Sequence, residues 1–185
     1  MQSLYKHNAK DIYITIYTFA LCLYKLCILF LVKLAYTLSM SEPEMSSGSI
    51  HVGYADGACR HTRNLASTAW VIYSPSGQLL SSGGSCLGPS TNNLAEYSAV
   101  IELLVDAIHH GIDHLIVRLD SQLVVSHLNG IYHIRNPMLL RKYLRIKLLE
   151  RQFQFITYEH IPRNLNHVSD AFANNVLDWH LRHNQ

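Results

Sequence analysis

The apolar positions of the chain change in character near residue 40. Residues 12–38 form an almost continuous apolar stretch, rich in Ile, Leu, Tyr and Phe and interrupted only by Lys25 and Lys33. A membrane-spanning helix would explain this stretch, although two lysines inside a span are costly. A signal peptide is a second interpretation, but no small-residue cleavage site follows the stretch. The third interpretation is an N-terminal extension with no role at a membrane.

From about residue 50 onward, alternating segments and helical repeats follow one another in the order of an α/β domain. We expect strands over residues 50–55, 66–73, 78–86, 114–119 and 153–159. We expect helices over residues 94–108, 121–128, 137–150 and 168–180. A serine-rich stretch with Pro43 and Gly48 comes before them and is typical of a flexible linker. The sequence therefore predicts an apolar extension over 1–40, a linker over 41–49 and a folded domain over 50–182.

Two local patterns refine this prediction. The dipeptide Asp56-Gly57 follows the first expected strand and is typical of a tight turn, so we expect the strand to end there. Thr91, Asn92 and Asn93 come directly before the longest helical repeat, and each is a candidate for the N-cap of that helix.

Four carboxylates lie where predicted elements end or begin. Asp56 and Asp120 follow strands, Glu96 lies in the first turn of the long helix, and Asp170 lies at the start of the last helix. Ligands of open α/β sheets bind at such positions. Four converging carboxylates repel one another unless divalent cations neutralise them, and sites made of oxygen ligands suit Mg²⁺ or Mn²⁺. A single Asp after a strand is usually a turn former, so the interpretation depends on the neighbouring residues.

Composition and charge exclude some classes of protein. Hydrophobic residues make up 49% and charged residues 15% of the 185 residues, which excludes a disordered chain. The net charge of +2 is by itself no argument for nucleic-acid binding. The 4 cysteines form no CxxC pair, so we expect free thiols in a reducing compartment. An intracellular location is therefore expected, with a membrane tether through residues 12–38 as the alternative.

Five sequence motifs resemble those of type 1 ribonuclease H. They span Tyr54–Cys59, Thr91–Tyr97, Leu119–Val124, His160–Arg163 and Asn166–Asn174. The similarity is greatest to the domain of plant Gypsy-type retroelements and their domesticated relatives. It implies a ribonuclease H-like α/β fold, in which a five-stranded mixed sheet carries helices on its faces. It also implies hydrolysis of the RNA strand of RNA/DNA hybrids with two Mg²⁺ ions, for which Mn²⁺ can substitute.

The resemblance also assigns roles at the reacting centre. It carries the catalytic and metal-binding acids of the family onto Asp56, Glu96, Asp120 and Asp170. Asp56 and Asp120 would hold the ions. Glu96 would bind one ion and help to place the attacking water, and Asp170 would complete the second metal site. His160 matches a family histidine that is thought to assist product release or proton transfer. The alternative is a surface histidine, because the chain contains 12 of them.

A hybrid is distinguished from duplex DNA by its 2′-hydroxyl groups, which lie in a wide and shallow minor groove. The residues that match the family's hybrid-binding positions are Gly57, Cys59, Asn92, Asn93 and Gln122. For the two asparagines the alternative is helix capping alone, and for the cysteine it is a small buried side chain. Residues 135–151 contain a run of Lys and Arg that includes Arg141 and Arg145. We expect this segment to bind phosphates, and a solvated helix face is the alternative.

The chain departs from the family at residues 60–66, which replace a turn that is usually rich in glycine and proline. We expect this turn to lack residues that readily adopt positive φ, so the first hairpin should differ from that of the family. The predicted function is that of a monomeric endonuclease that leaves 5′-phosphate and 3′-hydroxyl ends and needs no small-molecule cofactor. The alternative is a catalytically silent nucleic-acid-binding remnant of a retroelement domain. A membrane-tethered scaffold is a third hypothesis. The intact set of four acids favours catalysis over the silent remnant, because a binding-only domain gains little from four mutually repelling acids.

Overall fold

The computed structural model describes residues 49–183. The chain divides into two units, residues 1–46 and residues 47–185, and the described residues belong to the second. The apolar stretch over residues 12–38 lies outside the described residues, so its three interpretations remain open. Within residues 49–183, no helix is both long enough and apolar enough to cross a bilayer.

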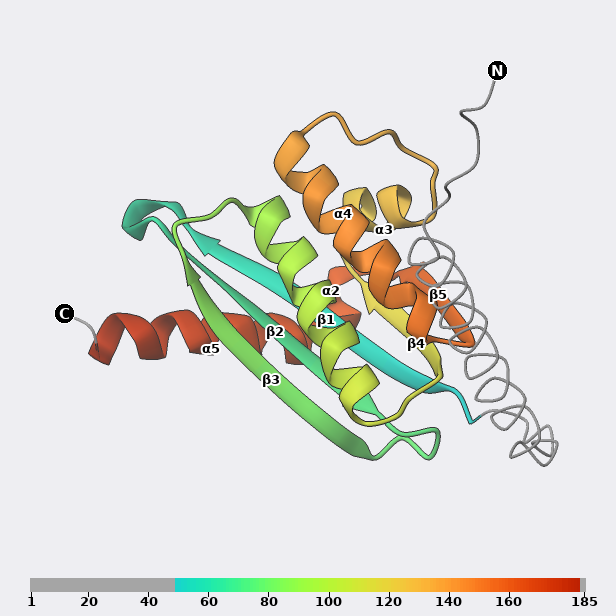
Figure 1. The fold of residues 1–185 in the computed structure, drawn as a ribbon. Coiled ribbons are helices and arrows are strands. Elements are labelled where there is room, and N and C mark those ends of the chain that lie inside the picture. The colour runs from blue at the N-terminus through green and yellow to red at the C-terminus, as the bar shows by residue number, and fades with distance from the viewer. Residues whose placement is uncertain (1–48, 184–185) are drawn as a thin grey trace, which may run out of the picture. The chain divides into compact units, whose positions relative to one another are not determined.

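A mixed five-stranded sheet forms the centre of the described residues (Figure 1). Its strands are β1 (His51–Arg60), β2 (Leu65–Tyr73), β3 (Leu79–Gly88), β4 (His114–Leu119) and β5 (Phe155–His160). They lie in the order β3-β2-β1-β4-β5. The pairs β1–β2 and β2–β3 are antiparallel, whereas β1–β4 and β4–β5 are parallel. The α/β fold with a five-stranded mixed sheet, expected from the sequence, is confirmed.

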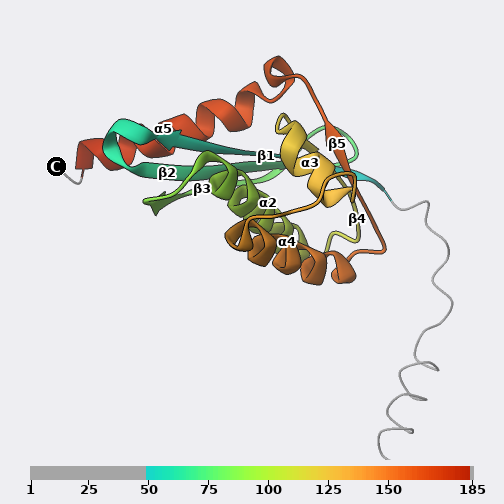
Figure 2. The same ribbon diagram turned by 90° about the horizontal axis from the view of Figure 1, so that it is seen from above.

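Helices cover both faces of this sheet. They are α2 (Asn92–His109), α3 (Gln122–Leu128), α4 (Pro137–Leu149) and α5 (His167–His183), with short 3-10 turns η1 (His61–Arg63), η2 (Glu150–Gln152) and η3 (Arg163–Leu165). Figure 2 shows α5 on one face of the sheet and α2 and α4 on the other. The four predicted helices are therefore present, with bounds that agree with the prediction to within a few residues.

The main core lies between the sheet and α2, which is buried on most of its circumference. Tyr97, Val100 and Leu104 of α2 are fully buried. α4 packs against α2 on the side away from the sheet. α2 therefore buries more of its surface than the single apolar stripe that its sequence spacing predicts. The one exception is Val105, which matches the apolar spacing but has 46% of its surface exposed.

The prediction that the first strand ends at Asp56-Gly57 is wrong. β1 continues to Arg60, and both residues of the dipeptide pair with β2, opposite Ala69 and Thr68. The dipeptide is therefore not a turn. Gly57 is needed for a different reason, because α2 passes very close to the strand at this position.

The expectation for the β1–β2 turn is also wrong. The turn contains a positive-φ residue, Asn64, with a φ of 49°. Asparagine adopts this conformation more readily than most residues that carry a side chain. The 3-10 turn η1 and Asn64 together close the hairpin without glycine or proline.

Candidate active site

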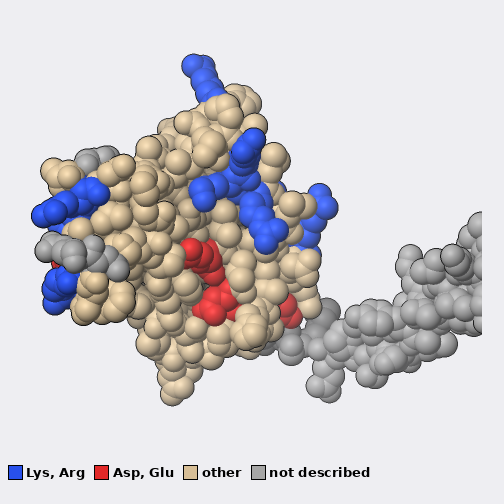
Figure 3. All heavy atoms as spheres, turned by 60° about the vertical axis from the view of Figure 1, so that its left-hand side comes forward, with Lys and Arg blue, Asp and Glu red and all other residues tan. Residues whose placement is uncertain are grey.

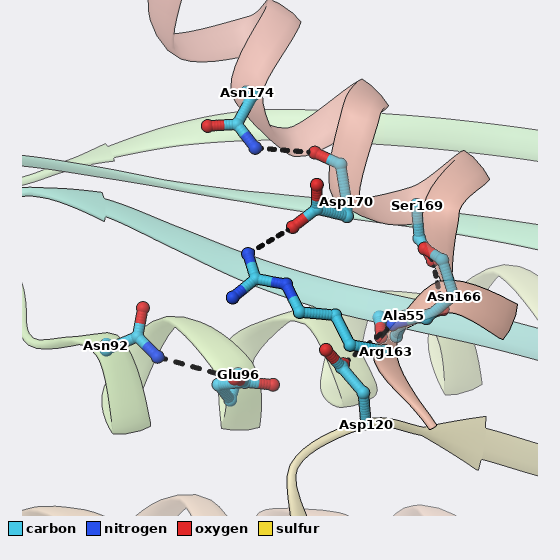
Figure 4. Close-up of polar contacts among 9 residues, drawn as sticks. All are labelled: Ala55, Asn92, Glu96, Asp120, Arg163, Asn166, Ser169, Asp170 and Asn174. Atoms are coloured by element: carbon cyan, nitrogen blue, oxygen red, sulfur yellow. Dashed lines mark hydrogen bonds and ion pairs between the residues drawn. The ribbon is translucent and has the colours of Figure 1, made fainter. Parts of the chain in front are cut away.

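The four predicted acids come from different parts of the chain and line one cavity. Figure 4 shows three of them, Glu96, Asp120 and Asp170. Asp56 lies within β1, Glu96 in α2, Asp120 directly after β4 and Asp170 in the first turn of α5. Carboxylate oxygens of Asp56, Glu96 and Asp120 lie within 4.8 Å of one another, close enough to bind one metal ion together. Asp170 lines the same cavity but does not belong to this cluster of three.

Gly57 allows the first two carboxylates to approach each other. A Cβ atom at this position would lie 2.2 Å from the backbone nitrogen of Glu96 and 2.4 Å from the carbonyl carbon of Ala95. Both neighbours are backbone atoms, which cannot rotate away as a flexible side chain can. Glycine therefore lets α2 lie against β1, and this contact brings Glu96 next to Asp56.

Asn166 connects three parts of the site. Its side chain is 1% exposed, and its Nδ2 donates to the carbonyl oxygen of Ala55 at 3.0 Å and to Oδ1 of Asp120 at 2.8 Å. The hydroxyl of Ser169 donates to the amide oxygen of Asn166. These hydrogen bonds fix the Asp120 carboxylate relative to β1 and to the start of α5. The sequence contains Asn166 in one of its motifs but gave no reason to assign it this role.

Arg163 is the cationic side chain that lines the cavity, and its place at the end of the motif His160–Arg163 does not mark it as a site residue. Its Nη2 contacts Oδ1 of Asp170 at 2.6 Å. The hydrogen bond to Asp170 is the main cause of the raised pKa of Arg163, which stays charged. The Arg163 side chain is 78% exposed, so it reaches the carboxylates from the solvent side. It follows Pro162 in the turn before α5, where no periodic pattern points to the site.

Burial and mutual repulsion make the ionised form of the cluster unfavourable when no cation is present. Burial, followed by the charges of Asp120 and Asp170, raises the pKa of Asp56 to about 6. Burial, followed by the charges of Asp56 and Asp120, raises the pKa of Glu96 to about 9. A divalent cation among these oxygens would relieve the repulsion. Three converging carboxylates are also the donor set that Mg²⁺ and Mn²⁺ prefer, so the residues fit such an ion.

The raised pKa values predict how pH changes the effect of Mg²⁺ on stability. Between pH 4.5 and about 9 the folded state holds a proton on Glu96 that the unfolded state releases. Without metal, the contribution of Glu96 is therefore most favourable below pH 4.5 and is lost as the pH rises toward about 9. A bound Mg²⁺ would take the place of this proton, so we expect Mg²⁺ to raise the melting temperature more at about pH 8.5 than at about pH 6.

Thermal unfolding at both pH values, in EDTA and in Mg²⁺, measures this difference. In Glu96→Gln the Mg²⁺-induced shift of the melting temperature should depend less on pH, because the titrating carboxyl group is gone. An equal Mg²⁺-induced shift at the two pH values in the unaltered chain would contradict the assignment.

The carboxylates line a cavity of about 170 Å³. Three of the residues that were predicted to bind the hybrid also line it, namely Gly57, Cys59 and Asn92. Nδ2 of Asn92 donates to Oε1 of Glu96 at 3.4 Å. The N-cap of α2 is Thr91, whose Oγ1 accepts from the backbone nitrogen of Leu94 at 3.4 Å. Asn92 is therefore not the cap of this helix, and its side chain is directed to the site.

Three other predicted site residues do not line the cavity. Asn93 is exposed in the first turn of α2. Gln122 is exposed at the start of α3, where its Nε2 donates to Oγ of Ser126 at 3.0 Å. His160 is exposed at the end of β5, where it pairs with Leu119. The role assigned to His160 stays a prediction.

The basic segment divides into exposed and internally bound side chains. Arg141 and Arg145 are exposed on α4, and neither takes part in an ion pair within residues 49–183. Lys147 differs, because its Nζ donates to the carbonyl oxygen of Leu128 at 2.8 Å and to Oε1 of Glu150 at 2.9 Å. Figure 3 shows the Lys and Arg side chains of one face in separate groups with acidic side chains between them.

Comparison with known proteins gives consistent relatives. The model of the family described as reverse transcriptase-like matches residues 54–176. Ribonuclease HI of Halobacterium salinarum is 40% identical over 131 residues, which cover 71% of this chain and 65% of the relative. A bifunctional protein of Mycobacterium tuberculosis is 34% identical over 125 residues, which cover 67% of this chain and 34% of the relative. The chain thus spans less than two thirds of the length of each of these curated relatives.

Solved structures match the described fold over nearly their whole length. The crystal structure of ribonuclease H1 from H. salinarum has a TM-score of 0.68 and 39% identity, and the match covers 70% of this chain and 98% of that one. The N-terminal ribonuclease H domain of the M. tuberculosis protein has a TM-score of 0.70 and 32% identity, with 74% and 99% covered. LC11-RNase H1, solved in complex with an RNA/DNA hybrid, has a TM-score of 0.67 and 31% identity, with 71% and 99% covered. The chain therefore belongs to the reverse transcriptase-like family, and its described residues form a type 1 ribonuclease H-like domain.

Proposed function

We propose that this chain is a metal-dependent endonuclease that hydrolyses the RNA strand of RNA/DNA hybrids. The observation that carries the proposal is the cluster of Asp56, Glu96 and Asp120, whose oxygens lie within 4.8 Å of one another. A domain that only binds nucleic acid gains nothing from burying mutually repelling acids beside its binding surface. The direct test is cleavage of a labelled hybrid in Mg²⁺ and its loss in EDTA.

The protein's contribution is to hold the carboxylates in place. Asp56, Glu96 and Asp120 would bind the first divalent cation, and Asp170 would contribute to a second. When bound, the cations would stabilise negative charge on the attacking and leaving oxygens of the phosphodiester. Asn166 keeps the Asp120 carboxylate oriented, so this group needs no rearrangement when substrate binds. Arg163 places a positive charge at the solvent side of an otherwise acidic cavity, where a phosphate group would enter.

The hybrid as substrate is supported by the relatives and by the lining of the cavity. Ribonuclease HI of H. salinarum and the hybrid-bound LC11-RNase H1 share the fold at more than 30% identity. Gly57 and Cys59 leave space beside the carboxylates, and Asn92 presents a neutral amide there. Small residues and neutral donors suit contact with ribose 2′-hydroxyls, which duplex DNA lacks.

Replacement of the two asparagines tests this substrate preference. We expect Asn92→Ala and Asn93→Ala each to weaken hybrid binding by about 3- to 10-fold, because each loses an ordinary polar contact. Duplex DNA should lose less affinity. Fluorescence anisotropy with labelled hybrid and labelled duplex DNA, in Ca²⁺ or without metal, measures the dissociation constant of each complex.

Thr91→Ala is the matched control for helix capping. It removes the N-cap of α2 and should cost about 1 kcal/mol of stability, with little change in the preference for hybrid. Equal losses of hybrid and duplex affinity in the asparagine variants would contradict a role in substrate selection.

We propose that Arg141 and Arg145 contact the phosphate backbone of the hybrid. Replacing both with Ala should reduce the slope of log affinity against log salt concentration by about one to two, because each phosphate contact contributes about 0.9 to that slope on duplex DNA. Affinity measured at four or more salt concentrations gives the slope. Lys147→Met is the matched control, since Lys147 is bound internally and its loss should change stability with little effect on the slope. An unchanged slope in the double variant would leave α4 as a solvated face.

The finer parts of the proposal rest on the sequence motifs. These are the descent from plant Gypsy-type retroelements, the assistance of His160 in product release, the two-ion stoichiometry and the monomeric state. The independent folding of residues 50–182 and an intracellular location also stay predictions. A chain that binds the hybrid well but does not cut it in Mg²⁺ or Mn²⁺ would favour the alternative, a catalytically silent binding module.

A further inference from the structure

A second basic surface lies at the end of the molecule where the β1–β2 turn meets the last turns of α5. Figure 2 draws η1 near the C-terminal half of α5, and an ion pair between Arg60 and Asp178 joins this turn region to the helix. Nη2 of Arg60 contacts Oδ1 of Asp178 at 2.8 Å, and Nε of Arg182 donates to the carbonyl oxygen of Asp178 at 3.1 Å. Arg63 is exposed in η1, three residues after Arg60. Residues 60–65 and 174–183 together contain three arginines and one acid, Asp178, so these two segments carry a net positive charge.

An exposed tryptophan lies within this group of arginines. Trp179 has 57% of its surface exposed, and its ring stacks on that of His183 with centroids 4.6 Å apart and planes 25° apart. Trp179 follows Asp178 and lies one helical turn before Arg182, so the indole and the guanidinium are neighbours on the helix surface. His183 covers one face of the indole, and the exposed remainder of the ring is available for stacking on another flat group.

β1 and α5, which carry Arg60 and Arg182, also carry Asp56 and Asp170 at the acidic cavity. β1 leads from Asp56 to Arg60, a length of about 13 Å at the usual rise of a strand. α5 leads from Asp170 to Asp178, a length of about 12 Å at the rise of a helix. The basic surface thus begins roughly three to four nucleotides away from the cluster, at about 3.4 Å per nucleotide along one strand.

We propose that Arg60, Arg63, Trp179 and Arg182 form a binding surface for single-stranded nucleic acid, which holds the unpaired nucleotides that flank a hybrid at the cleavage site. This inference rests on the proposed function for the position of the hybrid. Unpaired bases expose their π-faces and stack on aromatic side chains, while arginines bind the backbone between them. Paired bases cannot stack on Trp179 in this way, so the surface favours a single strand over the duplex itself.

A labelled single strand tests the proposal without any cleavage step. The full chain is titrated, without divalent metal, into fluorescein-labelled oligo(dT) of about twelve nucleotides, and affinity is measured by anisotropy. Trp179→Ala should weaken binding by about 5- to 150-fold, because stacking of one base on an aromatic ring is worth about 1–3 kcal/mol. Trp179→Phe should restore much of the affinity. Leu79→Ala, at an equally exposed apolar residue on β3, should leave it unchanged.

Two further measurements separate a binding surface from a structural role. The chain has 2 tryptophans, so binding of oligo(dT) should quench the emission of the unaltered chain and leave that of Trp179→Phe, which retains only Trp70, nearly constant. Asp178→Asn should tighten binding, because it removes the one acid of the surface and frees Arg60 for a phosphate. Arg182→Ala should weaken the binding of oligo(dT).

The outcomes for this surface and for the nuclease are distinguishable. A chain that cuts the hybrid but binds oligo(dT) equally well with and without Trp179 overturns the inference and leaves the proposed function intact. Quenching that persists in Trp179→Phe overturns it as well, because Trp70 would then report the binding. A chain with the expected oligo(dT) results but no hybrid cleavage retains the single-strand surface and loses the nuclease proposal.

Discussion

Asp120→Asn is expected to abolish hybrid cleavage while preserving hybrid binding. Asn keeps the shape of the side chain, and its amide oxygen can still accept the hydrogen bond that Asn166 donates to Oδ1 of Asp120 at 2.8 Å. It lacks the negative charge that a shared divalent cation requires. Metal ions contribute several kcal/mol to the stabilisation of charge in phosphodiester cleavage. At about 1.4 kcal/mol per tenfold, the rate should fall at least roughly a thousandfold.

Folding and binding should survive this change. The charge of Asp120 is one of the causes that raise the pKa of Asp56 and of Glu96, so its removal lowers the repulsion within the cluster. The variant should therefore be at least as stable as the unaltered chain when no metal is present. Single-turnover cleavage and hybrid affinity are measured on both chains in Mg²⁺. Asp113→Asn, at an exposed acid outside the cavity, is the control and should cut normally. Comparable rates for Asp120→Asn and the unaltered chain would remove Asp120 from the metal site.

Gly57→Ala is expected to be the most destabilising single-methyl change near the site. The added Cβ would lie 2.2 Å from a backbone nitrogen and 2.4 Å from a backbone carbon of α2, so the helix and β1 have to separate. Overpacking usually costs about 1–3 kcal/mol, and a clash with two backbone atoms of α2 should reach or exceed roughly 3 kcal/mol. The separation also moves Glu96 away from Asp56, so Mg²⁺ should no longer raise the melting temperature.

Gly77→Ala provides the matched glycine replacement. Gly77 has a φ of 80°, and an added Cβ would meet no atom within 4 Å. Its cost should be limited to the backbone strain of about 1–2 kcal/mol, and the Mg²⁺ effect should remain. Urea denaturation of the three chains, with and without Mg²⁺, gives the free energies of unfolding. If Gly57→Ala unfolds at the same urea concentration as Gly77→Ala and still responds to Mg²⁺, the close approach of α2 to β1 does not control the site.

The order of strands and helices, and the meeting of the four acids, could be predicted because they depend on local pattern. The short apolar run over residues 114–119 predicted a buried strand, and the helical spacing from Leu94 to Ile108 predicted a helix, because both patterns are local and visible in the sequence. Acids that follow parallel strands or begin the next helices reach the same edge of the sheet, as Asp120 and Asp170 do. Resemblance to ribonuclease H then identified which acids these are.

The remaining features depend on contacts between distant residues, which no local pattern reveals. Asp56-Gly57 has the composition of a turn, and only the backbone of α2 against Gly57 shows why the glycine stands inside a strand. Arg163 lies in an irregular turn, so nothing in its spacing directs it toward Asp170. Lys147 belongs to a basic run in the sequence, yet its contacts with Leu128 and Glu150 make it part of the fold.

We propose that the carboxylate cluster, with a divalent cation, cuts the RNA strand of a hybrid. The most direct measurement uses the full chain with a hybrid whose RNA strand carries an end label, in Mg²⁺, in Mn²⁺ and in EDTA, and separates the products on a denaturing gel. Duplex DNA and duplex RNA of the same sequence serve as controls, and Asp120→Asn controls for contaminating nucleases.

Internal cuts in the RNA strand of the hybrid are expected in Mg²⁺ or Mn²⁺, with 5′-phosphate and 3′-hydroxyl ends. No cuts are expected in EDTA, in either control duplex, or with Asp120→Asn. Tight binding of the hybrid by the unaltered chain without any cut in either metal would contradict the account, and so would equal cleavage by the unaltered chain and Asp120→Asn.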